Sequence, residues 1–154
     1  MVAAALPHGP EDIDPTWLTG ALAARHPGTS VAAVRVRETR QVTNTHAFLH
    51  VDYDGPTTAP EEMFCKMLPL DPARRELLAR SEMGPREVQF YEHLRPLLPH
   101  LRVPEVHVAV FDPRDQAFVL LMEDLEHGGC EVPDGTWGIG ADAAALALED
   151  LAAL

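Results

Sequence analysis

The apolar stretch MFCKML, residues 63–68, contains one lysine where a buried strand is expected. Side chains alternate between the two faces of a strand, so Lys66 shares a face with Phe64 and Leu68, and Met63, Cys65 and Met67 share the other. Burying an ammonium group without a partner is costly. Glu87 follows near the start of a predicted helix that can pack on the sheet. We therefore predict a Lys66–Glu87 ion pair, which would hold the ammonium group within reach of phosphate oxygens.

The elements that position this pair follow from periodicity and from turn residues. Asp14 is typical of a helix N-cap, and Pro15 of a first helical residue. After this helix the pattern predicts three strands, two helical segments, two further strands and a last helix. This order predicts an α+β fold, a five-stranded antiparallel sheet with a helix inserted between strands three and four. The predicted strands lie in residues 33–40, 48–53, 63–68, 104–111 and 117–122, and the later helices in residues 71–82, 85–98 and 141–154.

Composition excludes several classes of protein. Hydrophobic residues make up 46% of the 154 residues, which is enough for a core, and the net charge of −12 disfavours broad nucleic-acid binding. Cys65 and Cys130 are far apart, which argues against a disulfide scaffold and a zinc site. No apolar run reaches the roughly 20 residues of a membrane span, and the first residues lack the basic region of a signal peptide. We predict a cytoplasmic protein without nucleic-acid or membrane partners.

Four segments together resemble a known family. A lysine on strand three, a glutamate on the next helix, two more strands and an abrupt linker resemble the N-terminal lobe of the protein-kinase-like fold. The segments FCKML, REVQFYEHL, VPEVHVAVFD and FVLLMEDL resemble the corresponding sequences of aminoglycoside phosphotransferases and choline-kinase-like small-molecule kinases. The resemblance is strongest to the ecdysteroid-kinase-like sub-group. The resemblance covers roughly residues 30–127, and the last helix continues it.

The resemblance implies an ATP site and assigns its residues. Lys66 would contact the α- and β-phosphates, and Glu87 would orient Lys66. The loop RQVTNTHAF would cover the phosphates, although it contains no glycine to let its backbone approach them closely. Thr43, Asn44 and Thr45 would supply the hydroxyl and amide groups of this loop. The hinge that binds adenine through its backbone would be Glu123, Asp124 and Leu125. Leu121 and Met122 would line the adenine pocket.

The catalytic half of the family pattern has no counterpart in the sequence. The only asparagine, Asn44, precedes Lys66, and no H-x-D-x-x-x-x-N pattern occurs. We therefore expect no catalytic or metal-binding residue in this chain, and Mg²⁺ only together with a further lobe. Residues 1–122 would form the N-terminal lobe, and residues 123–154 the hinge and the start of a truncated C-terminal lobe.

Two functions remain open at this stage. The first is the ATP-binding lobe of a kinase that transfers the γ-phosphate to a hydroxyl of a small acceptor in the full-length protein, with this chain inactive alone. The second is a non-catalytic lobe that binds nucleotide weakly or only contacts other proteins. In either case we expect the isolated chain to self-associate through Leu148, Leu151 and Leu154 of the last helix. Each feature also has an ordinary structural interpretation. Lys66 alone is consistent with a strand lysine that reaches solvent, and Glu87 alone with an exposed residue on a helix. The segment VTNT alone is consistent with a simple turn. The acceptor, and the choice between ATP and GTP, stay undetermined.

Overall fold

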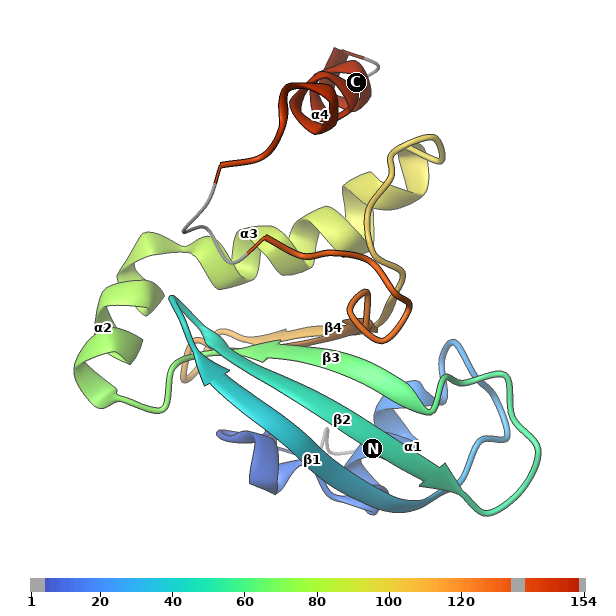
Figure 1. The fold of residues 1–154 in the computed structure, drawn as a ribbon. Helices are drawn as coiled ribbons and strands as arrows, with labels where there is room; N and C mark the ends of the chain where they lie inside the picture. The colour runs from blue at the N-terminus through green and yellow to red at the C-terminus, as the bar shows by residue number, and fades with distance from the viewer. Residues whose placement is uncertain (1–4, 134–137, 153–154) are drawn as a thin grey trace.

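A computed structural model describes residues 5–133 and 138–152 (Figure 1). It contains one sheet of five antiparallel strands in the order β1-β2-β3-β5-β4. The predicted α+β class and five-stranded antiparallel sheet are confirmed. The strands are β1 (Val31–Gln41), β2 (Thr45–Tyr53), β3 (Glu62–Met67), β4 (Val106–Asp112) and β5 (Ala117–Glu123).

The first two α-helices begin where the sequence places their caps, whereas the third begins at Met83 rather than at the predicted Pro85. The side chain of Asp14 accepts a hydrogen bond from Trp17 N at 2.7 Å, and that of Asp71 accepts one from Arg74 N at 2.8 Å. The second predicted helical segment is divided: after α3 the chain makes a π-helical turn and a 3₁₀ turn that contains Pro96. The helical elements are η1 (Pro10–Asp12), α1 (Pro15–Leu22), α2 (Pro72–Ser81), α3 (Met83–Gln89), η2 (Phe90–Leu94), η3 (Arg95–Leu97) and α4 (Ala141–Ala152).

The sheet separates two hydrophobic clusters, and α1 and α3 cover its opposite faces (Figure 1). Leu18 and Leu22 of α1 pack against one face, and Val88 of α3 packs against the other with Tyr91 of η2. The predicted faces of β3 are confirmed: Met63, Cys65 and Met67 lie in the α1 cluster, whereas Phe64 and Leu68 lie in the α3 cluster. Lys66 therefore projects from the face that α3 covers.

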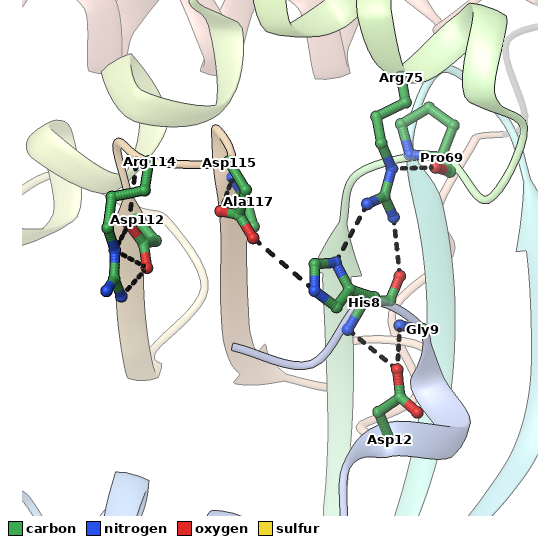
Figure 2. Close-up of polar contacts among 9 residues, drawn as sticks. All are labelled: His8, Gly9, Asp12, Pro69, Arg75, Asp112, Arg114, Asp115 and Ala117. Atoms are coloured by element: carbon green, nitrogen blue, oxygen red, sulfur yellow. Dashed lines mark hydrogen bonds and ion pairs between the residues drawn. The ribbon is translucent and has the colours of Figure 1, made fainter. Parts of the chain in front are cut away.

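The N-terminal segment is tied to two distant parts of the chain (Figure 2). The guanidinium group of Arg75 in α2 donates to the backbone oxygen of His8 at 2.9 Å and to His8 Nδ1 at 3.2 Å. Arg75 Nε also donates to Pro69 O at 3.2 Å, and His8 Nε2 lies 3.7 Å from a carboxylate oxygen of Asp115 in the β4–β5 turn. These contacts hold the start of the chain against α2 and against the β4–β5 turn.

The last helix, α4, lies apart from the sheet (Figure 1). Arg102 Nε donates to both carboxylate oxygens of Asp150 in α4, at 2.9 and 2.8 Å. Leu148 and Leu151 are 63% and 62% exposed, as expected, while Leu154 lies outside the described residues. Within residues 5–133 and 138–152, no helix is both long and apolar enough to cross a membrane.

Candidate functional site

Lys66 of β3 and Glu87 of α3 form the predicted ion pair. Lys66 Nζ donates to Glu87 Oε2 at 2.6 Å, and the two side chains are only 20% and 29% exposed. An ammonium group carries three donors. One of them serves Glu87, so the other two remain available to the oxygens of a ligand. The lysine that the sequence places in an apolar strand thus meets a carboxylate from the neighbouring helix.

Gly84 allows α3 to approach the sheet closely enough for this contact. Gly84 is buried against Phe118 of β5, and a Cβ added at Gly84 would lie 2.7 Å from Phe118 Cε1, with Phe118 Cδ1 closer still. Val88 packs in the same cluster, one turn further along α3. Because Glu87 is set between these two buried positions, the close packing of α3 directs its carboxylate to Lys66.

Two rows of side chains cross the sheet on the face of Lys66. In the strand register Arg40 opposes His46 and His46 opposes Lys66, which gives a basic row over β1, β2 and β3. In the neighbouring row Phe48 opposes Phe64, and Phe64 opposes Met122. The rings of Phe48 and Phe64 meet edge to face with centroids 5.3 Å apart. A basic row beside an apolar aromatic row suits a ligand that has both an anionic group and a planar ring.

Arg40 and Arg37 connect β1 to the segment after β5. Arg40 donates to both oxygens of Glu126, at 2.6 and 3.0 Å, and to both oxygens of Glu38 at the same two distances. Its guanidinium carbon also lies 4.4 Å from the ring centroid of Phe48. Because β2 and β3 separate β1 from β5 in the sheet, Arg40 reaches over the aromatic row to contact the segment after β5.

Arg37 makes the second of these connections. It donates to the buried Asp124 at 2.6 Å, and its Nε forms an ion pair with Glu62 Oε2 at 2.7 Å. Sequence reasoning found the strand but not the contacts of Arg37 with Asp124 and of Arg40 with Glu126, since these partners lie more than 80 residues away.

Two backbone donors of the predicted hinge, Asp124 N and Leu125 N, make no hydrogen bond to a residue that the structure describes. Glu123 N donates to Glu105 O at 2.8 Å, and the carbonyl groups of Asp124 and Leu125 accept from Gly128 N at 3.0 Å and Cys130 N at 2.9 Å. Asp124 is only 5% exposed, whereas Leu125 is partly exposed, so the N–H of Leu125 is the more accessible of the two.

The two residues predicted to line an adenine pocket face opposite sides of the sheet. Met122 belongs to the aromatic row and to the α3 cluster, whereas Leu121 is fully buried in the α1 cluster. The prediction for Leu121 is wrong because successive residues of a strand point to opposite faces. Met122 lies on the same face of the sheet as Lys66.

The predicted covering loop is short. β1 ends at Gln41 and β2 begins at Thr45, so only residues 42–44 lie between the two strands. Thr45 is fully buried and its hydroxyl donates to Gln41 Oε1 at 3.1 Å, while Asn44 is only 4% exposed. Thr43 is exposed. The structure thus leaves Thr43 as the loop residue, among the three that sequence analysis named, whose side chain is accessible to a ligand.

The site offers anion-binding groups rather than metal ligands. Among residues 5–133 and 138–152, no three His, Cys, Asp or Glu side chains are grouped so that they could hold a metal ion. Glu87, the carboxylate nearest Lys66, is already engaged with the ammonium group. The described residues around Lys66 thus present donors for an anionic group.

Comparison with known proteins identifies one family. A model of the ecdysteroid kinase-like family matches residues 43–154, which include β2, β3, both members of the ion pair and α4. No curated protein and no solved structure gives a significant match.

Proposed function

The chain belongs to the ecdysteroid kinase-like family, and from this premise we propose that it supplies the ATP-binding lobe of a small-molecule phosphotransferase. Residues 1–122 would correspond to the N-terminal lobe of the protein-kinase-like fold, and residues 123–154 to the hinge and the start of a second lobe. The family indicates small-molecule kinase activity in general. The role of this chain within that activity is argued from its own residues.

The observation that carries the proposal is the Lys66–Glu87 pair between an antiparallel sheet and the helix α3 that packs on it. Lys66 contacts the α- and β-phosphates through its two remaining donors, and Glu87 holds its ammonium group in place. Thr43 and the backbone of residues 42–44 lie at the end of the sheet where β1 and β2 meet, so they cover the phosphates. Asn44 and Thr45 support this loop from within, since both are buried.

The base lies on the aromatic row. Phe48, Phe64 and Met122 lie on the same face as Lys66, one row away from it, and the base contacts Phe64, because Phe48 and Met122 are each only 5% exposed. Leu125 N–H donates to the ring edge, and the backbone of Glu123 and Asp124 borders the pocket. The apolar row and the basic row are adjacent, and a nucleotide has both a ring and phosphates to contact them. An isolated phosphate or an isolated aromatic ligand would use only one of the two rows.

We expect this chain to bind ATP weakly and to transfer no phosphate by itself. Phosphoryl transfer requires a residue that positions the acceptor hydroxyl and carboxylates that hold Mg²⁺ at the γ-phosphate. The sequence has no such set in the family's order, because Asn44 is its only asparagine. The acceptor, a small molecule with a hydroxyl group, would be held by residues other than those described.

The test is an ATP titration by calorimetry combined with a γ-phosphate transfer assay on the same sample. We expect a dissociation constant on the order of 1 mM, equivalent to about −4 kcal/mol. No ATP binding at about ten times that concentration would contradict the nucleotide role. Phosphate transfer by material cleared of contaminating kinases would contradict the division of the site between two lobes.

A second candidate function, a protein-interaction module, is favoured by the exposed face of α4. Leu148 and Leu151 are more than half exposed, and apolar surface of this kind promotes association. We expect the wild-type chain to self-associate in size-exclusion light scattering and to bind a hydrophobic dye. The double variant Leu148→Glu/Leu151→Glu should elute as a monomer.

Leu77→Glu is the matched control, because Leu77 is 70% exposed on α2, well away from α4. It should leave the association unchanged. A wild-type chain that is monomeric and binds no dye contradicts self-association through α4.

A further inference from the structure

His46 stands in the middle of the basic row without a hydrogen-bonding partner. It opposes Arg40 on one side and Lys66 on the other, and its ring meets Phe64 edge to face with centroids 5.0 Å apart. The side chain is half-buried, and its imidazole makes no hydrogen bond to a residue that the structure describes. Because the side chain is only half-buried, part of it is accessible to a ligand in the site.

The other two members of the row already have acidic partners. Arg40 donates four hydrogen bonds to Glu38 and Glu126, and Lys66 donates one to Glu87. Within the row, His46 is the basic side chain that no described carboxylate contacts. Its neutral form is consistent with this arrangement, because a second positive charge beside Lys66 would be repelled.

The surroundings of His46 favour that neutral form. Burial lowers the pKa of His46 below its usual range, and the positive charges of Lys66 on β3 and Arg40 on β1 lower it further. The carboxylate of Glu87 on α3 opposes this effect. At neutral pH His46 is therefore largely uncharged in the free protein, whereas an anion placed beside it would favour the charged form.

We propose that His46 is a second phosphate-binding side chain of the site and that it takes up a proton from solvent when the phosphates of a nucleotide bind. The proposal rests on the proposed function, because it assumes that phosphates occupy the space beside Lys66. The proton adds to the free ring nitrogen, and the resulting imidazolium donates to a phosphate oxygen. No covalent bond forms or breaks. Lys66 and His46 then contact the phosphates from adjacent strands, while Arg40 stays with its carboxylates.

The sign of the pH dependence follows from linkage. Bound phosphate raises the pKa of His46 above its lowered value in the free protein. Above both pKa values His46 is neutral in both states and contributes nothing through its charge. As the pH falls between them, binding is accompanied by proton uptake and becomes tighter. Below both values His46 is charged in both states and the gain is complete.

The experiment compares the wild-type chain with His46→Gln, and uses ATP and tripolyphosphate as probes without divalent metal. Dissociation constants are measured at pH 6 and pH 8 at constant ionic strength. Protonation of phosphate itself near pH 6 weakens binding equally in both proteins. We therefore compare, at each pH, the dissociation constant of His46→Gln divided by that of the wild-type chain. This ratio should be about fivefold larger at pH 6 than at pH 8. Calorimetry in two buffers of different ionisation enthalpy should show proton uptake that His46→Gln lacks.

Two further variants make the result unambiguous. His100→Gln, an exposed histidine outside the site, should behave as the wild-type chain. His46→Lys carries a permanent charge, and should bind both probes at least as tightly as the wild-type chain does at pH 6, without proton uptake. Equal pH dependence of the wild-type chain and His46→Gln overturns the inference, and leaves the proposed function intact if binding still requires Lys66. Absence of binding to either probe overturns both.

Discussion

Lys66→Ala is expected to abolish ATP binding by this chain. Two of the three ammonium donors of Lys66 are free for phosphate oxygens, and a hydrogen bond to a charged group contributes about 1.5–3 kcal/mol. ATP is expected to bind with only about −4 kcal/mol, so the loss of these two hydrogen bonds removes most of the binding free energy. The substitution also leaves the carboxylate of Glu87 without its partner and facing the phosphates, which adds repulsion.

Calorimetric titration with ATP measures this loss, and three controls interpret it. Lys66→Ala/Glu87→Ala removes the repelling carboxylate and should recover little binding, because no ammonium group returns. Lys66→Arg keeps the charge and should bind with intermediate affinity. Arg114→Ala removes a cation from the β4–β5 turn, where Arg114 contacts only Asp112 among the residues drawn in Figure 2, and should bind as the wild-type chain. ATP binding by Lys66→Ala at wild-type strength would show that the phosphates lie elsewhere.

The lysine content of the chain offers an independent measurement of the same contact. Lys66 is the only lysine in the sequence, so amine-selective methylation modifies Lys66 and the N-terminal amine alone. Saturating ATP should slow the modification of Lys66 several-fold and leave that of the N-terminal amine unchanged. Equal protection of both amines, or of neither, would contradict a direct contact between Lys66 and ATP.

Gly84→Ala is expected to lower the free energy of unfolding by about 2 kcal/mol. Overpacking a core costs about 1–3 kcal/mol, and the upper end applies here because the added Cβ would overlap the ring of Phe118, which is only 2% exposed. Alanine recovers about 1 kcal/mol through its better helix propensity. Relief of the overlap requires α3 to move away from β5, so the same variant should also separate Glu87 from Lys66 and weaken ATP binding.

Gly20→Ala is the matched control for this substitution, and urea unfolding measures both variants. Gly20 lies in α1, and a Cβ added there would meet no atom within 4 Å. Its replacement by alanine should therefore stabilise the protein by roughly 0.5–1 kcal/mol. Similar changes in stability for the two variants would contradict close packing of α3 on Phe118 as the reason for Gly84.

The sequence by itself determined the features that depend on local periodicity. The two faces of β3 follow from strict alternation over a short strand, and the caps at Asp14 and Asp71 follow from side-chain chemistry within one helical turn. The Lys66–Glu87 pair was predictable because an ammonium group in an apolar strand requires a carboxylate, and the next helix carries one. The antiparallel α+β arrangement followed from the order of these elements.

Only the tertiary structure decided how β1 contributes to the site. Strict alternation would place Arg40 on the same face as Val34 and Val36, which pair with the α1-side residues Val51 and Leu49. A register shift between Val36 and Glu38 reverses the faces, so Arg40 lies beside His46 instead. The sequence pattern does not reveal this irregularity, because a bulge depends on how two strands pair.

Long-range contacts decided the rest of the site. The ion pairs of Arg37 with Asp124 and of Arg40 with Glu126, the close packing at Gly84 and the burial of Asn44 and Thr45 all require elements that are distant in sequence to meet. Periodicity assigns a residue to a face, but its partner on that face depends on strand order and register. The residues of the ion pair could therefore be named from the sequence, whereas the basic and aromatic rows around it became visible only in the folded sheet.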